Sequence, residues 1–319
     1  MKEVRVSQRH AFSSGTHSNL RSQFRSYFGF CVYFKRTPLP ANLDTICGYA
    51  QFLSRSLKST SISNYLSGVK MLHILLGYEY VFTGNGILRL VLRGISRLNP
   101  HFPDRAPPMT PEILLKLFRT LDHQNSLECS VFACGLLLFF TMSRLGSILP
   151  AHKKVPQHKF LTISRVNLCS VGLLVTLAHT KTIQFGERML HIPLIRTDSP
   201  LCPVAAFAHA QTLARNTSLV HAFSFREADG SVSMLLASLF VTTIRSLLSR
   251  AGVADAHSYR GHSFRRGGAS WAFNSGVPGE LIQVCGDWKS EAYKVYLEFS
   301  MASKVTIAQQ ISRYLPSFV

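Results

Sequence analysis

A proline-rich segment, Asn99–Thr110 (NPHFPDRAPPMT), divides the chain into two parts with different patterns. Because proline removes a backbone donor and clashes within a helix, this segment ends the helical periodicity that precedes it. Apolar residues before it recur only at helical spacing, whereas after it the helical segments are interrupted by short β-branched runs. We therefore predict two domains, residues 1–103 and 104–319, and 319 residues suffice for two cores.

The first part is predicted to be entirely helical. The expected helices cover Ser18–Phe34, Leu43–Leu57, Ile62–Leu76 with Ser61 as its N-cap, and Leu88–Leu98. The last of these carries Arg89, Arg93 and Arg97 at i, i+4 and i+8, which places them on one face. No acidic residue pairs with this arginine stripe, so it is either a solvated face or a surface that contacts phosphates.

The second part is predicted to be mostly helical with one hairpin. The hairpin would join Val171–Thr180 and Met189–Leu194 through a polar turn that contains Gly186. The expected helices begin at Thr110 and continue as Leu127–Phe140, Pro203–Ala214, Leu235–Ala251, Ser263–Ser275, Pro278–Val284, Ser290–Phe299 and Lys304–Tyr314. The predicted fold class is mainly α, with an all-helical domain followed by an α-rich domain with a small antiparallel β-sheet.

The charge balance indicates a polyanionic partner. The chain has 35 Lys and Arg against 16 Asp and Glu, a formal net charge of +19. Residues 1–105 hold 14 basic and 4 acidic residues, and residues 106–319 hold 21 and 12, so both parts are basic. This even distribution is typical of two domains that bind one polyanion, and nucleic acid is expected ahead of a membrane surface.

The remaining composition indicates a soluble intracellular protein. The seven cysteines are scattered without a C-x-x-C pair or zinc-ligand spacing, which favours reduced thiols and predicts no metal. The longest apolar run, Val131–Met142, is too short to span a bilayer, and Met1–His10 lacks the apolar core of a signal peptide. No membrane association is expected.

The motifs narrow the chemistry. The sequence contains no G-x-x-x-x-G-K-[ST] loop, no G-x-S-x-G turn and no H-E-x-x-H, and its sparse acidic residues do not favour a two-metal nuclease. Phosphate chemistry would then depend on Arg, Lys and His around a Tyr or Ser nucleophile. Such residues occur in the order Arg144, Lys181, His262-x-x-Arg265, Trp288 and Tyr296.

This ordered set resembles the tyrosine recombinases of the phage-integrase type, and the resemblance covers nearly the whole chain. The first part resembles their helical core-binding (SAM-like) domain, notably in Ser59–Lys70, which adds Lys70 to the candidate DNA-binding residues. Phrases such as Lys181–Glu187, Leu201–Val204 and Asp287–Tyr293 look most like the eukaryotic crypton and DIRS mobile-element recombinases.

The resemblance implies a role for each position. Arg144 and Arg265 would hold the non-bridging oxygens of the scissile phosphate, and Lys181 would protonate the 5′-oxygen leaving group. His262 would hydrogen-bond the phosphate or assist proton transfer from the nucleophile, and Trp288 would donate its indole N–H or pack the site. Tyr296 would form the 3′-phosphotyrosyl bond, without ATP, metal or other cofactor.

Several alternatives stay open at this point. Tyr293 competes with Tyr296 as nucleophile, although its shorter distance from Trp288 in sequence is less typical of the family. Arg266 competes with Arg265 but does not fit H-x-x-R, and Trp288 is alternatively a core aromatic only. Ser147 stands where the family usually has an acidic residue, which departs from the pattern and puts turnover in doubt.

The function expected from this resemblance is cleavage and rejoining of duplex DNA through a Holliday junction by a homo-tetramer on two DNA sites. No small-molecule substrate is expected. Lys304–Leu315, with Val305, Ile307, Ala308, Ile311 and Leu315 on one side, would be a tail that docks on a neighbouring protomer or on its own domain. Integration or excision of a mobile element in the nucleus is the expected setting. The alternatives are a catalytically silent DNA-binding protein and a monomeric type IB topoisomerase.

Overall fold

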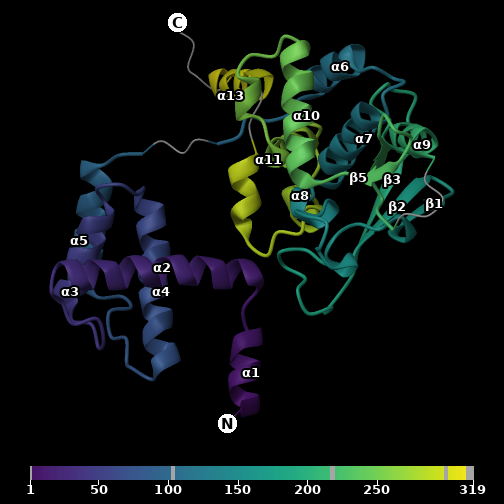
Figure 1. Cartoon of the computed structure of the whole chain (residues 1–319). Helices are drawn as coiled ribbons and strands as arrows, with labels where there is room; N and C mark the ends of the chain where they lie inside the picture. The colour runs from purple at the N-terminus through teal and green to yellow at the C-terminus, as the bar shows by residue number, and fades with distance from the viewer. Residues whose placement is uncertain (1, 102–104, 216–219, 298–300, 314–319) are drawn as a thin grey trace, which may run out of the picture. The chain divides into compact units, whose positions relative to one another are not determined.

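The chain forms two compact units, Met1–Asp104 and Arg105–Val319 (Figure 1). The computed structural model describes residues 2–101, 105–215, 220–297 and 301–313. The centre of the proline-rich segment, residues 102–104, therefore lies outside the described residues. Among the described residues, no helix is both long and apolar enough to cross a bilayer.

The first unit is built from helices only. They are α1 (Lys2–His10), α2 (Ser14–Tyr33), α3 (Leu43–Leu53), α4 (Ser59–Leu76) and α5 (Gly86–Leu98). Their core consists of apolar side chains from α2 to α5, with Tyr27, Ile46 and Ile62 fully buried. The side chains of Asn42 and Asn85 accept hydrogen bonds from the first-turn amides of α3 and α5, which fixes where these helices begin.

Several helices of this unit differ from the prediction. Helix α4 begins at Ser59 behind Lys58, so Ser61 lies inside the helix and is not its N-cap. Helix α3 ends at Leu53 rather than Leu57, because the backbone turns through Ser54. Helix α1 was not predicted, since its polar and basic sequence carries no clear apolar stripe.

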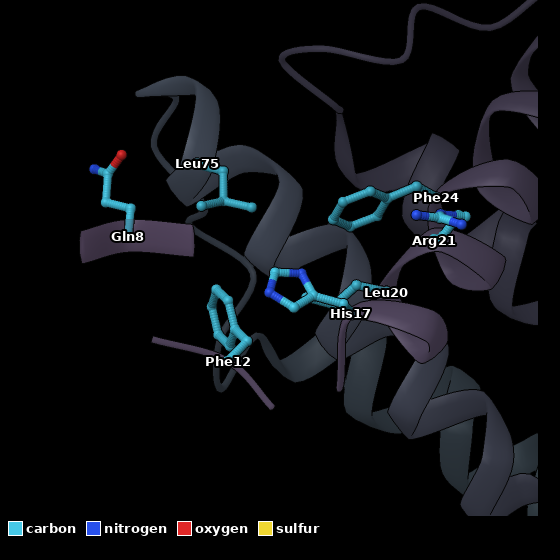
Figure 2. A pocket seen from close by; sticks show the side chains of 7 residues that line it. All are labelled: Gln8, Phe12, His17, Leu20, Arg21, Phe24 and Leu75. Atoms are coloured by element: carbon cyan, nitrogen blue, oxygen red, sulfur yellow. The ribbon is translucent and has the colours of Figure 1, made fainter. Parts of the chain in front are cut away.

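A hollow opens on the surface of the first unit where α1, α2 and α4 approach one another. Figure 2 shows its lining side chains: Gln8, Phe12, His17, Leu20, Arg21, Phe24 and Leu75. Phe12 and His17 meet edge to face, with ring centroids 5.8 Å apart. Four of these seven side chains are apolar: Phe12, Leu20, Phe24 and Leu75.

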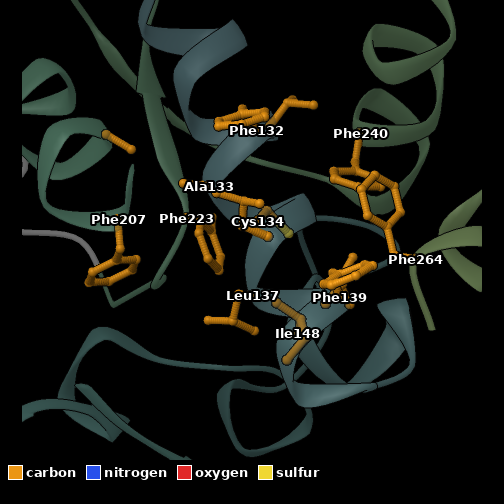
Figure 3. Close-up of a cluster of buried hydrophobic side chains, with 14 of the residues drawn as sticks. Phe132, Ala133, Cys134, Leu137, Phe139, Ile148, Phe207, Phe223, Phe240 and Phe264 are labelled. Atoms are coloured by element: carbon orange, nitrogen blue, oxygen red, sulfur yellow. The ribbon is translucent and has the colours of Figure 1, made fainter. Parts of the chain in front are cut away.

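The second unit is built around one buried helix. Its helices are α6 (Pro111–Thr120), α7 (Ser126–Thr141), α8 (Leu145–Ile148), α9 (Pro203–Ala214), α10 (Ala237–Arg250), α11 (Gly261–Asn274), α12 (Gly279–Cys285) and α13 (Met301–Ser312). Helix α7 packs against α9, α10 and α11, so nearly every one of its side chains is buried. Figure 3 shows the cluster that results, in which Cys134 and Leu137 of α7 lie near Phe223 and other aromatic rings.

Glycines allow α7 and α11 to approach closely. A Cβ atom at Gly268 would lie 2.0 Å from the carbonyl oxygen of Phe139, and one at Gly135 would lie 2.7 Å from the ring of Phe264. Such distances are far below van der Waals contact, so only glycine fits at Gly268. This close packing determines where α11 presents the rest of its side chains.

Two small antiparallel sheets complete the second unit. The first has the order β1–β2–β3, formed by Val166–Cys169, Gly172–Leu177 and Leu190–Ile195, with Val175 opposite Ile192. The second pairs β4 (Ser224–Arg226) with β5 (Val232–Met234). The predicted hairpin corresponds to β2 and β3, whereas β1, β4 and β5 were not predicted because three or four residues show no readable alternation.

The predicted C-terminal helices are partly wrong. Glu291–Tyr296 forms a 3₁₀-helix, η4, rather than the α-helix predicted over Ser290–Phe299, whose last residues lie outside the described ones. The Ser270 hydroxyl donates to the carbonyl oxygen of Tyr296 (2.6 Å), which ties the end of η4 to α11. Helix α13 begins at Met301, while Tyr314 and Leu315 lie outside the described residues.

Candidate active site

Arg265 is the central residue of the candidate site. It lies on α11 with 1% of its surface exposed, and its Nη1 donates to the carbonyl oxygens of Met142 and Gly286, the latter at 2.8 Å. Its guanidinium carbon lies 3.6 Å from the centroid of the Trp288 ring, a cation–π contact. Among the described residues, its Nε and Nη2 have no hydrogen-bond partner.

This arrangement leaves the charge of Arg265 without full compensation. Two carbonyl dipoles and a ring face orient the guanidinium but carry no negative charge. Burial and the nearby positive charge of Arg144 lower the pKa of Arg265, while Tyr296 and Asp287 act in the opposite direction. A buried cation held in this way is suited to bind an anion, and a planar guanidinium matches the oxygens of a phosphate.

Tyr296 lies beside Arg265 at the end of η4. Its ring centroid is 5.7 Å from the Arg265 guanidinium carbon and 5.5 Å from the Trp288 centroid. The side chain is half-buried, and the hydrogen bond from Ser270 ties its backbone to α11. A phenol thus reaches the candidate phosphate position from a segment that is anchored to the helix carrying Arg265.

Tyr293 and Trp288 belong to a small apolar cluster. Tyr293 is 5% exposed and packs with Met142, Ala269 and Ile282. Its hydroxyl faces α12, because a Cβ at Gly279 would lie only 2.8 Å from it. Trp288, 7% exposed, is part of this apolar cluster, and its ring also covers Arg265.

Arg144, Lys181 and His262 surround the same position. Arg144 precedes α8 and is half-buried, and its side chain makes no hydrogen bond or ion pair with any described residue. Lys181 is exposed in the connection between β2 and β3, and His262 is exposed near the start of α11.

Several nearby positive charges affect the pKa of His262. It is lowered because the surrounding protein removes part of its hydration, and also by the positive charges of Arg265, Arg144, Arg260 and Lys181. The structure therefore brings together residues that are far apart in sequence. The lowered pKa favours the neutral form of His262.

The rivals identified from the sequence occupy other environments. Arg266 donates from Nη1 to the carbonyl oxygen of Ala106 at 3.1 Å and so binds the segment before α6. Ser147 is buried, and its amide donates to the carbonyl oxygen of Arg144 at 2.9 Å. Of the described residues, no group of three or more His, Cys, Asp or Glu side chains is placed to hold a metal ion.

Sequence reasoning missed Asp287. This residue is 5% exposed, and its carboxylate accepts hydrogen bonds from Thr180, Thr182 and Arg188. These three residues flank Lys181 in the β2–β3 connection. The signal in the sequence is an acidic residue next to Trp288 in a chain that has few acidic residues.

The candidate DNA-binding residues of the first unit lie on α4 and α5. Arg89, Arg93 and Arg97 are exposed on α5, whose opposite side buries Leu88 and Ile95 in the core. Arg89 also donates to the carbonyl oxygen of Gly84 at 3.0 Å. Lys70, on α4, is half-buried.

Comparison with known proteins finds similarity to integrases and recombinases. No family model matches the sequence. An integrase/recombinase xerD homolog from Selenomonas ruminantium is 24% identical over 277 residues, which cover 82% of this chain and 74% of that protein.

Solved structures show the same fold. The Tn1549 transposon integrase in complex with transposon right-end DNA has a TM-score of 0.59 at 12% identity, with 97% of this chain and 98% of that chain covered. A lambda integrase tetramer bound to a Holliday junction has a TM-score of 0.55 at 13% identity, with coverages of 90% and 72%. The chain therefore has the mainly α fold of the tyrosine recombinases and integrases, with a small antiparallel sheet.

Proposed function

We propose that this protein is a site-specific DNA recombinase that cleaves and rejoins duplex DNA through a 3′-phosphotyrosyl intermediate. The observation that carries this proposal is the phenol of Tyr296 beside the buried, incompletely paired guanidinium of Arg265. Arg144, Lys181 and His262 gather at the same position. Together these side chains supply a nucleophile, stabilisation of charge and a proton donor.

The proposed reaction follows from these positions. The Tyr296 hydroxyl oxygen attacks the phosphorus, its proton passes to neutral His262 or to water, and the bond from phosphorus to the 5′-oxygen breaks. Lys181 protonates that oxygen as it leaves. Arg144 and Arg265 stabilise the additional negative charge on the non-bridging oxygens, while Trp288 keeps Arg265 in place.

Rejoining is the reverse of this reaction with a different 5′-hydroxyl. The phosphotyrosyl bond conserves the energy of the phosphodiester, so strand transfer proceeds without ATP. Exchange of one pair of strands produces a Holliday junction, and exchange of the second pair resolves it. We propose the two units as the core-binding domain and the catalytic domain of this enzyme.

The first unit would supply much of the non-specific affinity for DNA. Arg89, Arg93 and Arg97 form one exposed stripe, and cations on one helix face match the spacing of backbone phosphates. Lys70 is a further candidate on the neighbouring helix.

We propose a homo-tetramer on two DNA sites as the active assembly. Support comes from the tetrameric lambda integrase structure and from α13, whose Met301, Val305 and Ile311 side chains are exposed. An exposed apolar helix near the C-terminus is suited to dock on a neighbouring protomer. Deletion of residues 304–319 should abolish tetramer formation on DNA, and intact tetramers would contradict this assignment.

The biological setting is proposed from the motifs and the fold. The phrase Asp287–Tyr293 resembles crypton and DIRS recombinases, and a transposon integrase is among the structural relatives. Integration or excision of a mobile element in a eukaryotic nucleus accounts for both.

The test is covalent capture on a nicked suicide DNA substrate drawn from a pool of element-end sequences. Wild type should form a protein–DNA adduct, Tyr296→Phe should form none, and Tyr293→Phe should retain adduct formation in proportion to its folded fraction. Loss only in Tyr293→Phe would move the nucleophile to Tyr293. No adduct with DNA binding intact would favour a catalytically silent DNA-binding protein.

A further inference from the structure

The carboxylate of Asp287 joins two parts of the candidate active site. Thr180 donates to its Oδ2 at 2.5 Å, Thr182 donates to the same oxygen, and Arg188 Nη2 donates to Oδ1. Thr180 and Thr182 stand on either side of Lys181, while Arg188 precedes β3. One carboxylate thus binds both limbs of the β2–β3 connection.

The two chain neighbours of Asp287, Gly286 and Trp288, both contact Arg265. Asp287 follows α12 with a φ of 57°, the left-handed region that asparagine and aspartate tolerate better than most residues. The carbonyl oxygen of Gly286 before it accepts from Arg265, and Trp288 after it stacks on Arg265. Movement of this backbone would therefore reach Arg265 and Lys181 together.

The rest of the β2–β3 connection has few ties. Lys181 and Phe185 are exposed, and Ile183 is the fully buried side chain near the tip. Without the carboxylate, Thr180 and Thr182 would keep only short local bonds, chiefly with each other (3.1 Å) and with Ile183. The position of Lys181 consequently depends on Asp287.

We propose that Asp287 is a positioning residue that holds Lys181 at the leaving-group oxygen and couples that lysine to the Arg265–Trp288 pair. This inference rests on the proposed recombinase function. It assigns a carboxylate to the active site of a chain that has Ser147 where relatives carry an acidic side chain.

Asp287→Asn is the variant that isolates this role. An amide of the same shape has one acceptor, whereas the bonds to Oδ1 and Oδ2 require two. If the N–H₂ group faces Arg188, that bond is lost; if it faces the threonines, their hydroxyls must turn to accept instead of donate. In either case the negative charge that pairs with Arg188 is removed, so the hold on the connection weakens while the volume of the buried side chain stays the same.

The measurement is the single-turnover cleavage rate of two DNA substrates with the sequence selected in the covalent-capture experiment. One substrate has oxygen and the other has sulfur at the 5′-bridging position of the scissile phosphate. A 5′-thiolate is a much better leaving group than an alkoxide and does not require a general acid, so defects that act through Lys181 disappear on the sulfur substrate. Defects in nucleophile or in charge stabilisation remain.

We expect Asp287→Asn to cleave the oxygen substrate about 10- to 100-fold more slowly than wild type, which is no more than the lower end of the usual contribution of general acid catalysis because Lys181 itself is retained. On the sulfur substrate its rate should return to within about threefold of wild type, as should the rate of Lys181→Ala. Tyr296→Phe should be inactive on both. Thr182→Val, which removes one of the three donors from a half-buried position, should show a smaller loss with the same rescue.

Three results would overturn the inference. An unchanged rate of Asp287→Asn on oxygen, or an equal loss on oxygen and sulfur, would separate Asp287 from Lys181. The same conclusion would follow if Asp287→Asn did not fold and Thr182→Val were not rescued by sulfur. Absence of cleavage by wild type on both substrates would refute the proposed function itself, and the inference with it.

Discussion

Replacement of Gly268 by alanine should destabilise the second unit, because α7 and α11 are in direct backbone contact at this position. The new Cβ would lie 2.0 Å from the Phe139 carbonyl oxygen, 2.9 Å from its carbon and 3.2 Å from the Cγ of Met142. Ordinary contacts begin at 3.4 Å, so α7 and α11 must separate by about 1.4 Å. The contacting atoms are mainly backbone, which no rotamer change can move.

The expected cost follows from a graded series. Gly146→Ala meets nothing within 4 Å and should gain up to about 1 kcal/mol from helix propensity. Gly135→Ala meets the Phe264 ring at 2.7 Å and should cost about 1–3 kcal/mol, the usual range for overpacking. Gly268→Ala should cost about 3 kcal/mol or more, because two helices must move instead of one ring.

Tryptophan fluorescence during thermal unfolding measures this series in the correct unit, because Trp271 and Trp288 are the two tryptophans of the chain. At about 2–4 °C per kcal/mol for a domain of this size, Gly268→Ala should lower Tm by about 6–12 °C. The separation also moves the Met142 carbonyl away from Arg265, so cleavage should fall further than the folded fraction explains. A Tm within about 2 °C of wild type would refute the close-packing argument.

Three further outcomes are expected. Because the pKa of His262 is lowered in the folded protein, the unfolded chain binds a proton more readily, so the free energy of unfolding should fall as pH drops below about 6.5. Denaturation of wild type and His262→Gln from pH 7.5 to 5 should show a steeper fall for wild type, and parallel curves would contradict it. Burial raises the pKa of the Cys134 thiol well above its usual range, so a short pulse of iodoacetamide should leave Cys134 unmodified while half-buried Cys169 reacts; equal labelling by mass spectrometry would disprove this. Arg93→Ala should reduce the slope of log affinity for DNA against log salt by about 0.9, whereas Arg55→Ala, at an exposed arginine outside the stripe, should keep it.

Local signals predicted the elements that local interactions stabilise. Thr110 caps α6 through the amide of Ile113 with Pro111 in the first turn, as its sequence indicates. The β2–β3 hairpin was predicted because two apolar, β-branched runs flank a polar turn that contains Gly186. Strands β4 and β5 are too short to do so, and η4 was predicted as an α-helix because its spacing does not reveal the bond from Ser270 to Tyr296.

The sequence likewise identified some residues of the candidate site and missed another. Residue types and their order identified Arg144, Lys181, His262, Arg265 and Tyr296 as candidates, and their roles stay predictions until tested. Asp287 could not be recognised, because its partners Thr180, Thr182 and Arg188 lie 107, 105 and 99 residues away. Its orientation also depends on a left-handed backbone that the sequence alone does not specify.

The incomplete pairing of Arg265 has a consequence for the abundance of the protein. Anything that binds the folded state alone shifts the folding equilibrium by mass action, by about 2.7 kcal/mol at one hundred times its dissociation constant. A polyanion that completes the pairing of Arg265 would therefore act as a stabilising ligand. Molecules that find no DNA would unfold more often and be degraded sooner, so the population that persists would be the population already on its substrate.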